Sequence, residues 1–452
     1  MNEKSKIVII GCGAGGGTAA QFARKTNKNV DIIVFEKGIH PQYSRCGIPY
    51  AVSGVIPKVE DLIEFSKEWF EKQKIKLYLE TVVEKIDISK KIVTAKNNKK
   101  NIEVKFDKLI ICTGSKPFIP KIEKIDVDNV FVVRTIDDVK KMKSKIKKGQ
   151  NATIIGAGFI GLEMADNLNR MGLNVTIVET LSNILANNLD PDMSNIVFEK
   201  ISKKVKIYTD HKVEKIKYNN GKIKKIIIKS KKDNKIKEID TNFLIIAAGC
   251  KPNVKLAQDI GCKIGQTGGI TVNNKSETNV TNVYAAGDCT EFVDFVSKKP
   301  VLIGLGSIAV RQAIAAGINA GDGDYVLPKG VLLTITSEFF GIEIGAVGYT
   351  SDKYKNILSG KFNGFSLPKY FPGGKPISVK VLANRNGKIM GAQVVGDNAA
   401  QRVNSFATAI LGDLDIETFR KLETAYAPPI APTLDAVTLA CDIVSMKLAR
   451  MR

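Results

Sequence analysis

A glycine-rich segment occurs twice in this chain of 452 residues, and it restricts the fold more than any other feature. Residues 6–16, KIVIIGCGAGG, are repeated in outline by residues 151–161, NATIIGAGFIG. In each copy an apolar strand leads into G-x-G-x-x-G, a helix-compatible stretch follows, and a second apolar strand ends in an acid, Glu36 or Glu179. One such glycine motif is weak evidence, but this order, with the acid about 20 residues beyond the glycines, is typical of a dinucleotide-binding βαβ unit.

The three glycines of each loop have separate roles. The first permits the tight turn, the second lets a pyrophosphate approach the backbone, and the third lets the helix pack on the strand. They are Gly11, Gly13 and Gly16 in the first copy and Gly156, Gly158 and Gly161 in the second. The amides and positive end of the following helix hold the pyrophosphate, and the acid accepts hydrogen bonds from the ribose hydroxyls. Because Glu179 would repel a 2′-phosphate, the second site favours NADH, with NADPH as the alternative.

Two dinucleotide sites in one chain indicate a flavoprotein, with FAD at the first site and a nicotinamide nucleotide at the second. Two further segments match each other, KLIICTGSKP at 108–117 and FLIIAAGCKP at 243–252, and each predicts a buried strand that closes a nucleotide domain. The segment NVYAAGDCTE at 282–291 predicts a strand that ends at Asp288, whose carboxylate can accept a hydrogen bond from the ribityl chain of a flavin.

The predicted fold class is therefore α/β, with two Rossmann-like nucleotide-binding domains and a C-terminal α+β dimerisation domain. A glycine-, aspartate- and proline-rich linker at 321–330 precedes the last domain. There, residues 330–350 and 376–396 alternate like antiparallel strands, and helices are expected around 399–413 and 433–449. The predicted domains are FAD binding at 1–117 and 249–327, NAD(P)H binding at 118–248, and dimerisation at 328–452.

The formal charge is +22, and much of it comes from 14 lysines between residues 203 and 237. Apolar residues alternate with these lysines, which predicts hairpin strands with a solvated outer face. No aromatic interleaving accompanies the charge, so a nucleic-acid partner is not expected. No apolar run is long enough to cross a bilayer and the N-terminus has no signal-peptide pattern, which favours a cytoplasmic protein without a membrane partner.

The seven cysteines are scattered, which argues against both a disulfide framework and a structural metal site, so no metal is expected. Cys46 lies alone between an arginine and a glycine in FEKGIHPQYSRCGIPYAVSG, just after the first acid. Cys12, Cys112, Cys250 and Cys289 lie in or beside apolar strand ends and are predicted to be packing residues.

With both glycine loops, the matched strand ends, the Gly-Asp segment and the α+β domain in this order, the chain resembles the pyridine nucleotide–disulfide oxidoreductases over nearly its whole length. It lacks the two redox cysteines and the C-terminal histidine–glutamate pair of the glutathione-reductase type. The segment YSRCGIPYAVSG resembles instead the single-cysteine branch, which implies that Cys46 is the redox cysteine. Ala14 stands where peroxidases and many oxidases of that branch carry a histidine, as in coenzyme A-disulfide reductases.

The resemblance also implies roles for other residues. Tyr370 and Tyr426 would approach the cysteine of the partner subunit as catalytic residues of a homodimer with a shared active site. Lys25, Ser44 and Arg45 would contact the substrate. FAD would be bound by the first loop, Glu36 and Asp288. It would also contact Lys37, Val83, Thr113 and Gly114. The nicotinamide nucleotide would be bound by the second loop and Glu179, and also by Glu163 and Gly249.

The expected function is an FAD-dependent, NADH-dependent reduction of coenzyme A disulfide, or of a related low-molecular-weight disulfide or persulfide. Cys46 would form a mixed disulfide with coenzyme A as the bound thiol. The alternative is an oxygen-reducing NADH oxidase in which Cys46 cycles through a sulfenate. A third, non-enzymatic interpretation is a flavin-bearing redox sensor whose Cys46 state governs a partner.

Overall fold

The computed structural model describes residues 4–97, 100–122 and 129–451, and these form two compact units. The first unit consists of residues up to 118, 134–139 and 249–331, and the second of residues 119–133, 140–248 and 332 onwards. Across the described ranges, no helix is both long and apolar enough to span a membrane. The sheets of the two units confirm the predicted α/β class, whereas the exact domain boundaries stay a prediction.

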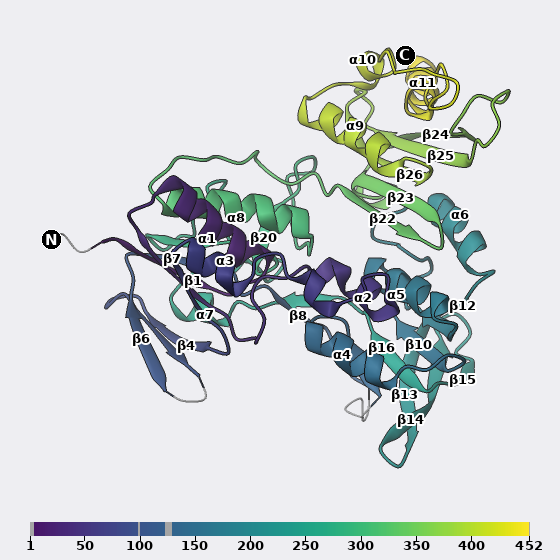
Figure 1. Ribbon diagram of the computed structural model, residues 1–452. Helices are drawn as coiled ribbons and strands as arrows, with labels where there is room; N and C mark the ends of the chain where they lie inside the picture. Colours follow the sequence, from purple (N-terminus) through teal and green to yellow (C-terminus); the bar gives the residue numbers. More distant parts are fainter. Residues whose placement is uncertain (1–3, 98–99, 123–128, 452) are drawn as a thin grey trace. The chain divides into compact units, whose positions relative to one another are not determined.

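The first unit is built on a five-stranded parallel sheet in the order β19-β7-β1-β2-β3. Its strands are almost wholly apolar because helices and loops cover both faces of a parallel sheet. Helix α1 (Ala14–Thr26) packs against α8 (Gly306–Ala320) on one face, as Figure 1 shows. The strands are β1 (Lys6–Ile10), β2 (Asp31–Phe35), β3 (Ile75–Tyr78), β7 (Lys108–Ile111) and β19 (Val283–Ala285).

Smaller elements complete this unit. A three-stranded antiparallel sheet is formed by β4 (Val82–Asp87), β5 (Ile92–Lys96) and β6 (Asn101–Lys105). The closing strands β8 (Ser115–Pro117) and β17 (Cys250–Pro252) pair with each other, and β18 (Ile270–Thr271), β20 (Thr290–Val293) and β21 (Pro300–Val301) form a third small sheet. The helices are η1 (Arg45–Gly47), α2 (Ile48–Ser53), η2 (Val59–Leu62), α3 (Lys67–Lys72) and α7 (Lys255–Asp259).

The second unit repeats this plan, which confirms the internal repeat. Its parallel sheet has the order β12-β11-β10-β16-β9, the counterpart of β3-β2-β1-β7-β19. The elements are β9 (Val130–Val132), α4 (Ile136–Lys145), which begins in the first unit, β10 (Asn151–Ile155), α5 (Phe159–Arg170), β11 (Asn174–Val178), α6 (Pro191–Ile201), β12 (Lys206–Tyr208) and β16 (Phe243–Ile246). The lysine-rich segment forms the antiparallel strands β13 (His211–Asn219), β14 (Lys222–Ser230) and β15 (Ile236–Asp240), as predicted.

A five-stranded antiparallel sheet, β22-β23-β26-β25-β24, and its helices form the rest of the second unit. The predicted strands and helices are confirmed as β22 (Ile335–Phe339), β23 (Ile342–Gly348), β25 (Pro376–Ala383), β26 (Ile389–Gly396), α9 (Ala399–Leu411) and α11 (Ala436–Ala449). The edge strand β24 (Leu358–Phe365), LSGKFNGF, the short helix α10 (Ile416–Phe419) and η3 (Ser351–Lys353) were not predicted. Gly360 of β24 lies where any side chain would meet the backbone of α11, 2.2 Å from the Ala440 carbonyl oxygen.

Candidate functional site

The two glycine loops have the same geometry. Gly11 and Gly156 have φ of 97° and 105°, a left-handed region that favours glycine. A Cβ added at Gly16 would lie 1.7 Å from the Gly11 carbonyl oxygen, and one added at Gly161 would lie 2.0 Å from the oxygen of Gly156. Both loops therefore require glycine at the turn and at the helix–strand contact, as predicted.

The acid after each second strand reaches back to its own loop. Glu36 accepts hydrogen bonds from the amides of Cys12 at 2.7 Å and Gly38 at 2.8 Å. Glu179 does the same with the amides of Ala157 at 2.7 Å and Leu181 at 2.8 Å. A carboxylate offers about four lone-pair positions, so each acid retains acceptor capacity for ribose hydroxyls.

Two guanidinium groups lie close to Gly13 of the first loop or to Gly114 after β7, which provides a test of whether an anionic dinucleotide fits there. Arg45 lies 3.6 Å from a Cβ built on Gly13, and both Arg45 and Arg134 lie within 3.7 Å of one built on Gly114. Burial and then the neighbouring Arg45 lower the pKa of Arg134, while Asp288 raises it. The Arg45 Nε is buried with no hydrogen-bond partner among the described residues. Two crowded cations with an orphaned donor fit the pyrophosphate of FAD.

The other predicted flavin contacts lie around the same loop. Asp288, which follows β19, accepts a hydrogen bond from the Ser115 hydroxyl at 3.0 Å and lies 3.5 Å from Arg134. Thr113 is held by two hydrogen bonds to Asn253, one of them from its hydroxyl at 2.6 Å. The Lys37 side chain is exposed.

Val83 differs from these residues, because its side chain is buried in the hydrophobic core of the first unit. Only its backbone groups can serve a ligand. Its predicted contact with FAD therefore stays a prediction for the main chain alone.

Cys46 lies in η1 and its side chain is exposed. A Cβ built on Gly306 would lie 3.9 Å from the Cys46 sulfur, so the thiol is next to the first residue of α8. The positive end of this 15-residue helix stabilises a negative sulfur at that position. The guanidinium of the neighbouring Arg45 lies close to Gly13 and Gly114.

The predicted substrate contacts Lys25 and Ser44, and Arg24 beside Lys25, differ in the contacts that they make within the chain. Arg24 donates hydrogen bonds to backbone carbonyls, among them those of Gln73 and Val30, and so fixes the end of α1. Lys25 is exposed, and its ammonium group lies 4.8 Å from the centre of the Phe22 ring. Ser44 precedes η1, and its amide donates to the Leu62 carbonyl while its hydroxyl caps no helix.

In the second unit, Glu163 lies on α5, and the Ser337 hydroxyl of β22 donates to its Oε1 at 2.8 Å. Burial raises the pKa of the Glu163 carboxyl, and the hydrogen bond from Ser337 lowers it in part. Gly158 has no atom within 4 Å of a built Cβ, which leaves open space over the loop where a pyrophosphate would lie. In the first unit, Gly249 has φ of 104° and accepts a hydrogen bond from the Phe118 amide.

Replacing Ser337 by alanine is expected to raise the pKa of Glu163 further. A carboxyl whose folded pKa exceeds its unfolded value weakens the fold as pH rises from about 4.3 through the folded pKa. Ser337→Ala should therefore cost more stability at pH 8 than at pH 5, measured by urea unfolding. In a Glu163→Gln background the cost of Ser337→Ala should no longer depend on pH, and a cost that still changes would contradict the assignment.

The two candidate tyrosines, far apart in sequence, meet in space. The hydroxyls of Tyr370 and Tyr426 lie 2.7 Å apart, and both side chains are exposed, to 70% and 49%. This hydrogen bond raises the pKa of Tyr370, which keeps its phenol protonated. The pair is thus a connected set of proton donors at the surface of the second unit.

Two residues at the first site were missed by sequence reasoning. Arg134 and Ser115 contact each other at 2.9 Å and both contact Asp288. A signal for Ser115 was present, since it follows Gly114 in a segment already identified as a strand end. Arg134 lies 118 residues after Gly16 of the first loop, and nothing in its local pattern, VVRTIDD, points to that loop.

The prediction that all strand-end cysteines are packing residues was partly wrong. Cys12, Cys112 and Cys289 are buried, and burial raises the pKa of each thiol, which makes them poor nucleophiles. Cys250 is exposed instead, because β17 pairs only with β8 and forms a two-stranded ribbon.

Comparisons with known proteins agree with these features. Residues 5–315 match the model of the pyridine nucleotide-disulphide oxidoreductase family, and residues 335–437 match the dimerisation domain of that family. An NADH oxidase of Methanocaldococcus jannaschii is 36% identical, over 98% of this chain and 99% of that protein.

Two further relatives act on sulfur, according to their names. The NAD(P)H sulfur oxidoreductase (CoA-dependent) of Pyrococcus furiosus is 32% identical over 98% of this chain and 99% of its own. The structure of an NAD-dependent persulfide reductase from A. fulgidus has a TM-score of 0.94 at 30% identity, covering 99% of this chain and 84% of that one. This chain therefore belongs to the pyridine nucleotide-disulphide oxidoreductase family and is an FAD- and NAD(P)H-dependent oxidoreductase.

Proposed function

We propose that this protein is an NADH-dependent reductase of coenzyme A disulfide, or of a related low-molecular-weight disulfide or persulfide, and that Cys46 carries the reaction. The observation that supports this most strongly is the exposed Cys46 thiol beside the amino end of α8. The CoA-dependent sulfur oxidoreductase of P. furiosus supports coenzyme A as the bound thiol.

The chemistry assigned to Cys46 needs one thiolate and one small thiol. The Cys46 thiolate attacks one sulfur of the disulfide, the S–S bond breaks, and one coenzyme A leaves as its thiolate. Cys46 is then joined to the second coenzyme A, and two electrons and a proton return it to a thiolate while coenzyme A leaves as a thiol. The first loop would hold FAD and the second would hold NADH, and these groups would supply the two electrons.

The remaining residues bind and protonate. Lys25, which is exposed, would attract the phosphates of coenzyme A, and Ser44 and Arg45 would line the approach to the thiol. Tyr370 and Tyr426, contributed by the other subunit of a homodimer, would donate a proton to the leaving thiolate. Their mutual hydrogen bond supports this role, because it holds the two hydroxyls together at one exposed place.

Intact-protein mass spectrometry of the purified flavoprotein tests the proposal. We expect an added mass equal to coenzyme A, attached at Cys46 and released by a reductant or by NADH. A purified protein that carries no thiol adduct, and acquires none on incubation with coenzyme A disulfide, would contradict the proposed mixed disulfide.

A second candidate function is supported by the M. jannaschii relative, whose name is NADH oxidase. In that case Cys46 would cycle through a sulfenate and oxygen would be the electron acceptor. Oxygen consumption with NADH distinguishes the two functions. An oxidase consumes oxygen at an undiminished rate when coenzyme A disulfide is in excess, whereas a disulfide reductase diverts its electrons to the disulfide.

A further inference from the structure

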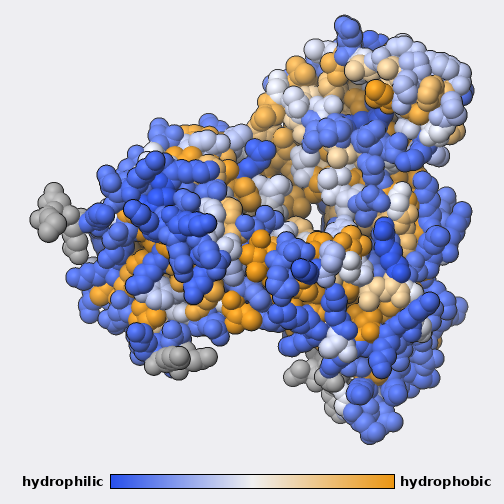
Figure 2. All heavy atoms as spheres, in the orientation of Figure 1, coloured by the Kyte–Doolittle hydropathy of each residue, from blue (hydrophilic) through white to orange (hydrophobic). Residues whose placement is uncertain are grey.

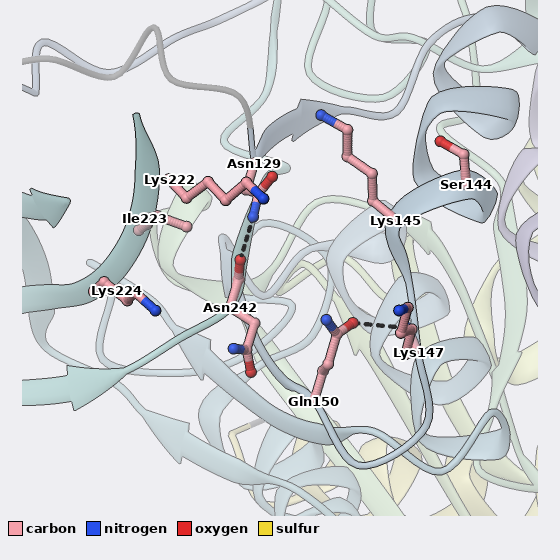
Figure 3. Close-up of a pocket in the computed structure, with 9 residues that line it drawn as sticks. All are labelled: Asn129, Ser144, Lys145, Lys147, Gln150, Lys222, Ile223, Lys224 and Asn242. Atoms are coloured by element: carbon pink, nitrogen blue, oxygen red, sulfur yellow. Dashed lines mark hydrogen bonds between the residues drawn. The ribbon is translucent and has the colours of Figure 1, made fainter. Parts of the chain in front are cut away.

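A cavity of about 350 Å³ lies in the second unit, and its residues come from four separate segments. Figure 3 shows the end of α4 and the loop after it on one side, and strand β14 on the other. Its volume falls at the lower end of the range of small-molecule sites. The cavity, here called the lysine pocket, is lined by Asn129, Ser144, Lys145, Lys147, Gln150, Lys222, Ile223, Lys224 and Asn242.

The lysine pocket is separate from the second glycine loop. Asn129, Gln150 and Asn242 each come directly before the three adjacent parallel strands β9, β10 and β16. They therefore lie at the amino-terminal edge of the sheet, whereas Gly156 follows β10 at the carboxyl edge. Strands of four or five residues, at about 3.3 Å a residue, place these edges about 15 Å apart. No role in dinucleotide binding accounts for the lysine pocket.

The described lining of the lysine pocket carries charge of one sign. Among the lining residues that the structure describes, four are lysines and none is acidic. In the part of the chain that the structure describes, the ammonium groups of Lys147, Lys222 and Lys224 form no ion pair with a carboxylate. Other lysines of the same sheet are neutralised, as Lys217 and Lys225 are by Glu238. Figure 2 shows a hydrophilic surface around the hairpin of β13 and β14.

Two amide side chains add hydrogen-bond donors to this charge. The Asn242 Oδ1 accepts from the Asn151 amide at 2.8 Å, and the Gln150 Oε1 accepts from the Lys147 amide at 2.7 Å. Because a backbone N–H can bond only the oxygen of each side chain, the orientation of both amides is fixed. Their NH₂ groups accordingly remain as donors, and a site of ammonium and NH₂ donors is suited to an anion with several oxygens.

We propose that the lysine pocket binds an oligophosphate anion, at a site distinct from both dinucleotide loops. The phosphate oxygens would accept hydrogen bonds from Asn242 and Gln150 and pair with Lys147, Lys222 and Lys224. An anion with several phosphates suits the lysine pocket because its lysines come from two sides of the cavity, the end of α4 with the loop after it and strand β14.

Calorimetric titration of inorganic triphosphate into the FAD-loaded enzyme, with excess NAD⁺ present, tests this site. The sharpest variant is Asn242→Asp, since the aspartate keeps the acceptor for the Asn151 amide and replaces the donor by a negative charge. We expect this variant and Lys222→Gln/Lys224→Gln to bind triphosphate at least about tenfold more weakly, and the affinity of the unchanged enzyme to fall as salt is raised.

The matched control is Lys203→Gln/Lys204→Gln, which removes the same charge at two exposed lysines outside the lysine pocket. The affinity of this control for triphosphate should stay within about twofold of that of the unchanged enzyme, because salt screens exposed charges that lie far from the lysine pocket. An equal loss in this control, an unaltered affinity in Asn242→Asp, or no binding to the unchanged enzyme would overturn the proposal. Adenosine triphosphate, titrated in parallel, shows by its relative affinity whether the free or the nucleotide-borne phosphate chain is preferred.

Discussion

Cys46→Ser is expected to abolish the turnover of coenzyme A disulfide by NADH. A serine hydroxyl is not ionised at neutral pH and cannot form a disulfide, so both halves of the cysteine cycle are lost. The expected fall in kcat is on the order of 10³-fold or more. Because the side chain is exposed, the substitution should leave the unfolding temperature and the flavin absorbance spectrum unchanged. The loss is measured as NADH oxidation under nitrogen.

The matched control is Cys250→Ser, which removes the other exposed thiol of the first unit. It should retain full disulfide turnover. If Cys46→Ser kept turnover within a few-fold of the unchanged enzyme, the redox role of Cys46 would be wrong. A loss confined to Cys250→Ser would transfer that role to the β17 thiol.

Of two alanine substitutions in the second glycine loop, one is expected to lower stability and the other to weaken nucleotide binding without lowering stability. Gly161→Ala places a methyl group 2.0 Å from the Gly156 carbonyl oxygen, and a backbone atom cannot move aside as a flexible side chain can. The expected cost is about 3 kcal/mol or more of unfolding free energy. Gly158→Ala meets no atom within 4 Å and has an ordinary φ of −80°, so it should leave stability unchanged.

Gly158→Ala should nevertheless weaken NADH binding by about tenfold or more. The added methyl group would lie between the pyrophosphate and the amides, where charge-assisted hydrogen bonds contribute about 1.5–3 kcal/mol each. Urea unfolding and NADH titration of both variants test the pair. Equal destabilisation by the two alanines, or normal NADH affinity in a folded Gly158→Ala, would show that the loop does not bind the pyrophosphate as proposed.

The repeat illustrates how much of the fold was predictable. The apolar strands, the glycines and the final acid all lie within about 30 residues in each copy, so local sequence was enough to predict both βαβ units and the order of their elements. The edge strand β24 was missed because its glycines and polar residues obscure the alternation. Gly360 is explained only by the backbone of α11 that lies against it.

The site was predictable to the same limit. Cys46 and the loop glycines are marked by their immediate neighbours. The residues next to Arg134 in sequence do not identify it as a site residue. It lies beside Ser115 and beside Asp288, which is 154 residues away in sequence, only because the strands and loops of the first unit pack together. The place of the Arg45 guanidinium, close to Gly13 and Gly114, depends on the same packing.

The sequence by itself determined the two nucleotide loops, the α/β class and the solitary cysteine. Turns that require glycine and strands that require apolar runs are specified by residues that are close together in sequence. Tertiary structure alone decided which charged groups meet. It brought Arg134 to the first loop, joined the hydroxyls of Tyr370 and Tyr426, and gathered the lysine pocket at one edge of a sheet. Electrostatic and hydrogen-bond contacts act over a few ångströms in space, and distance along the chain does not report that separation.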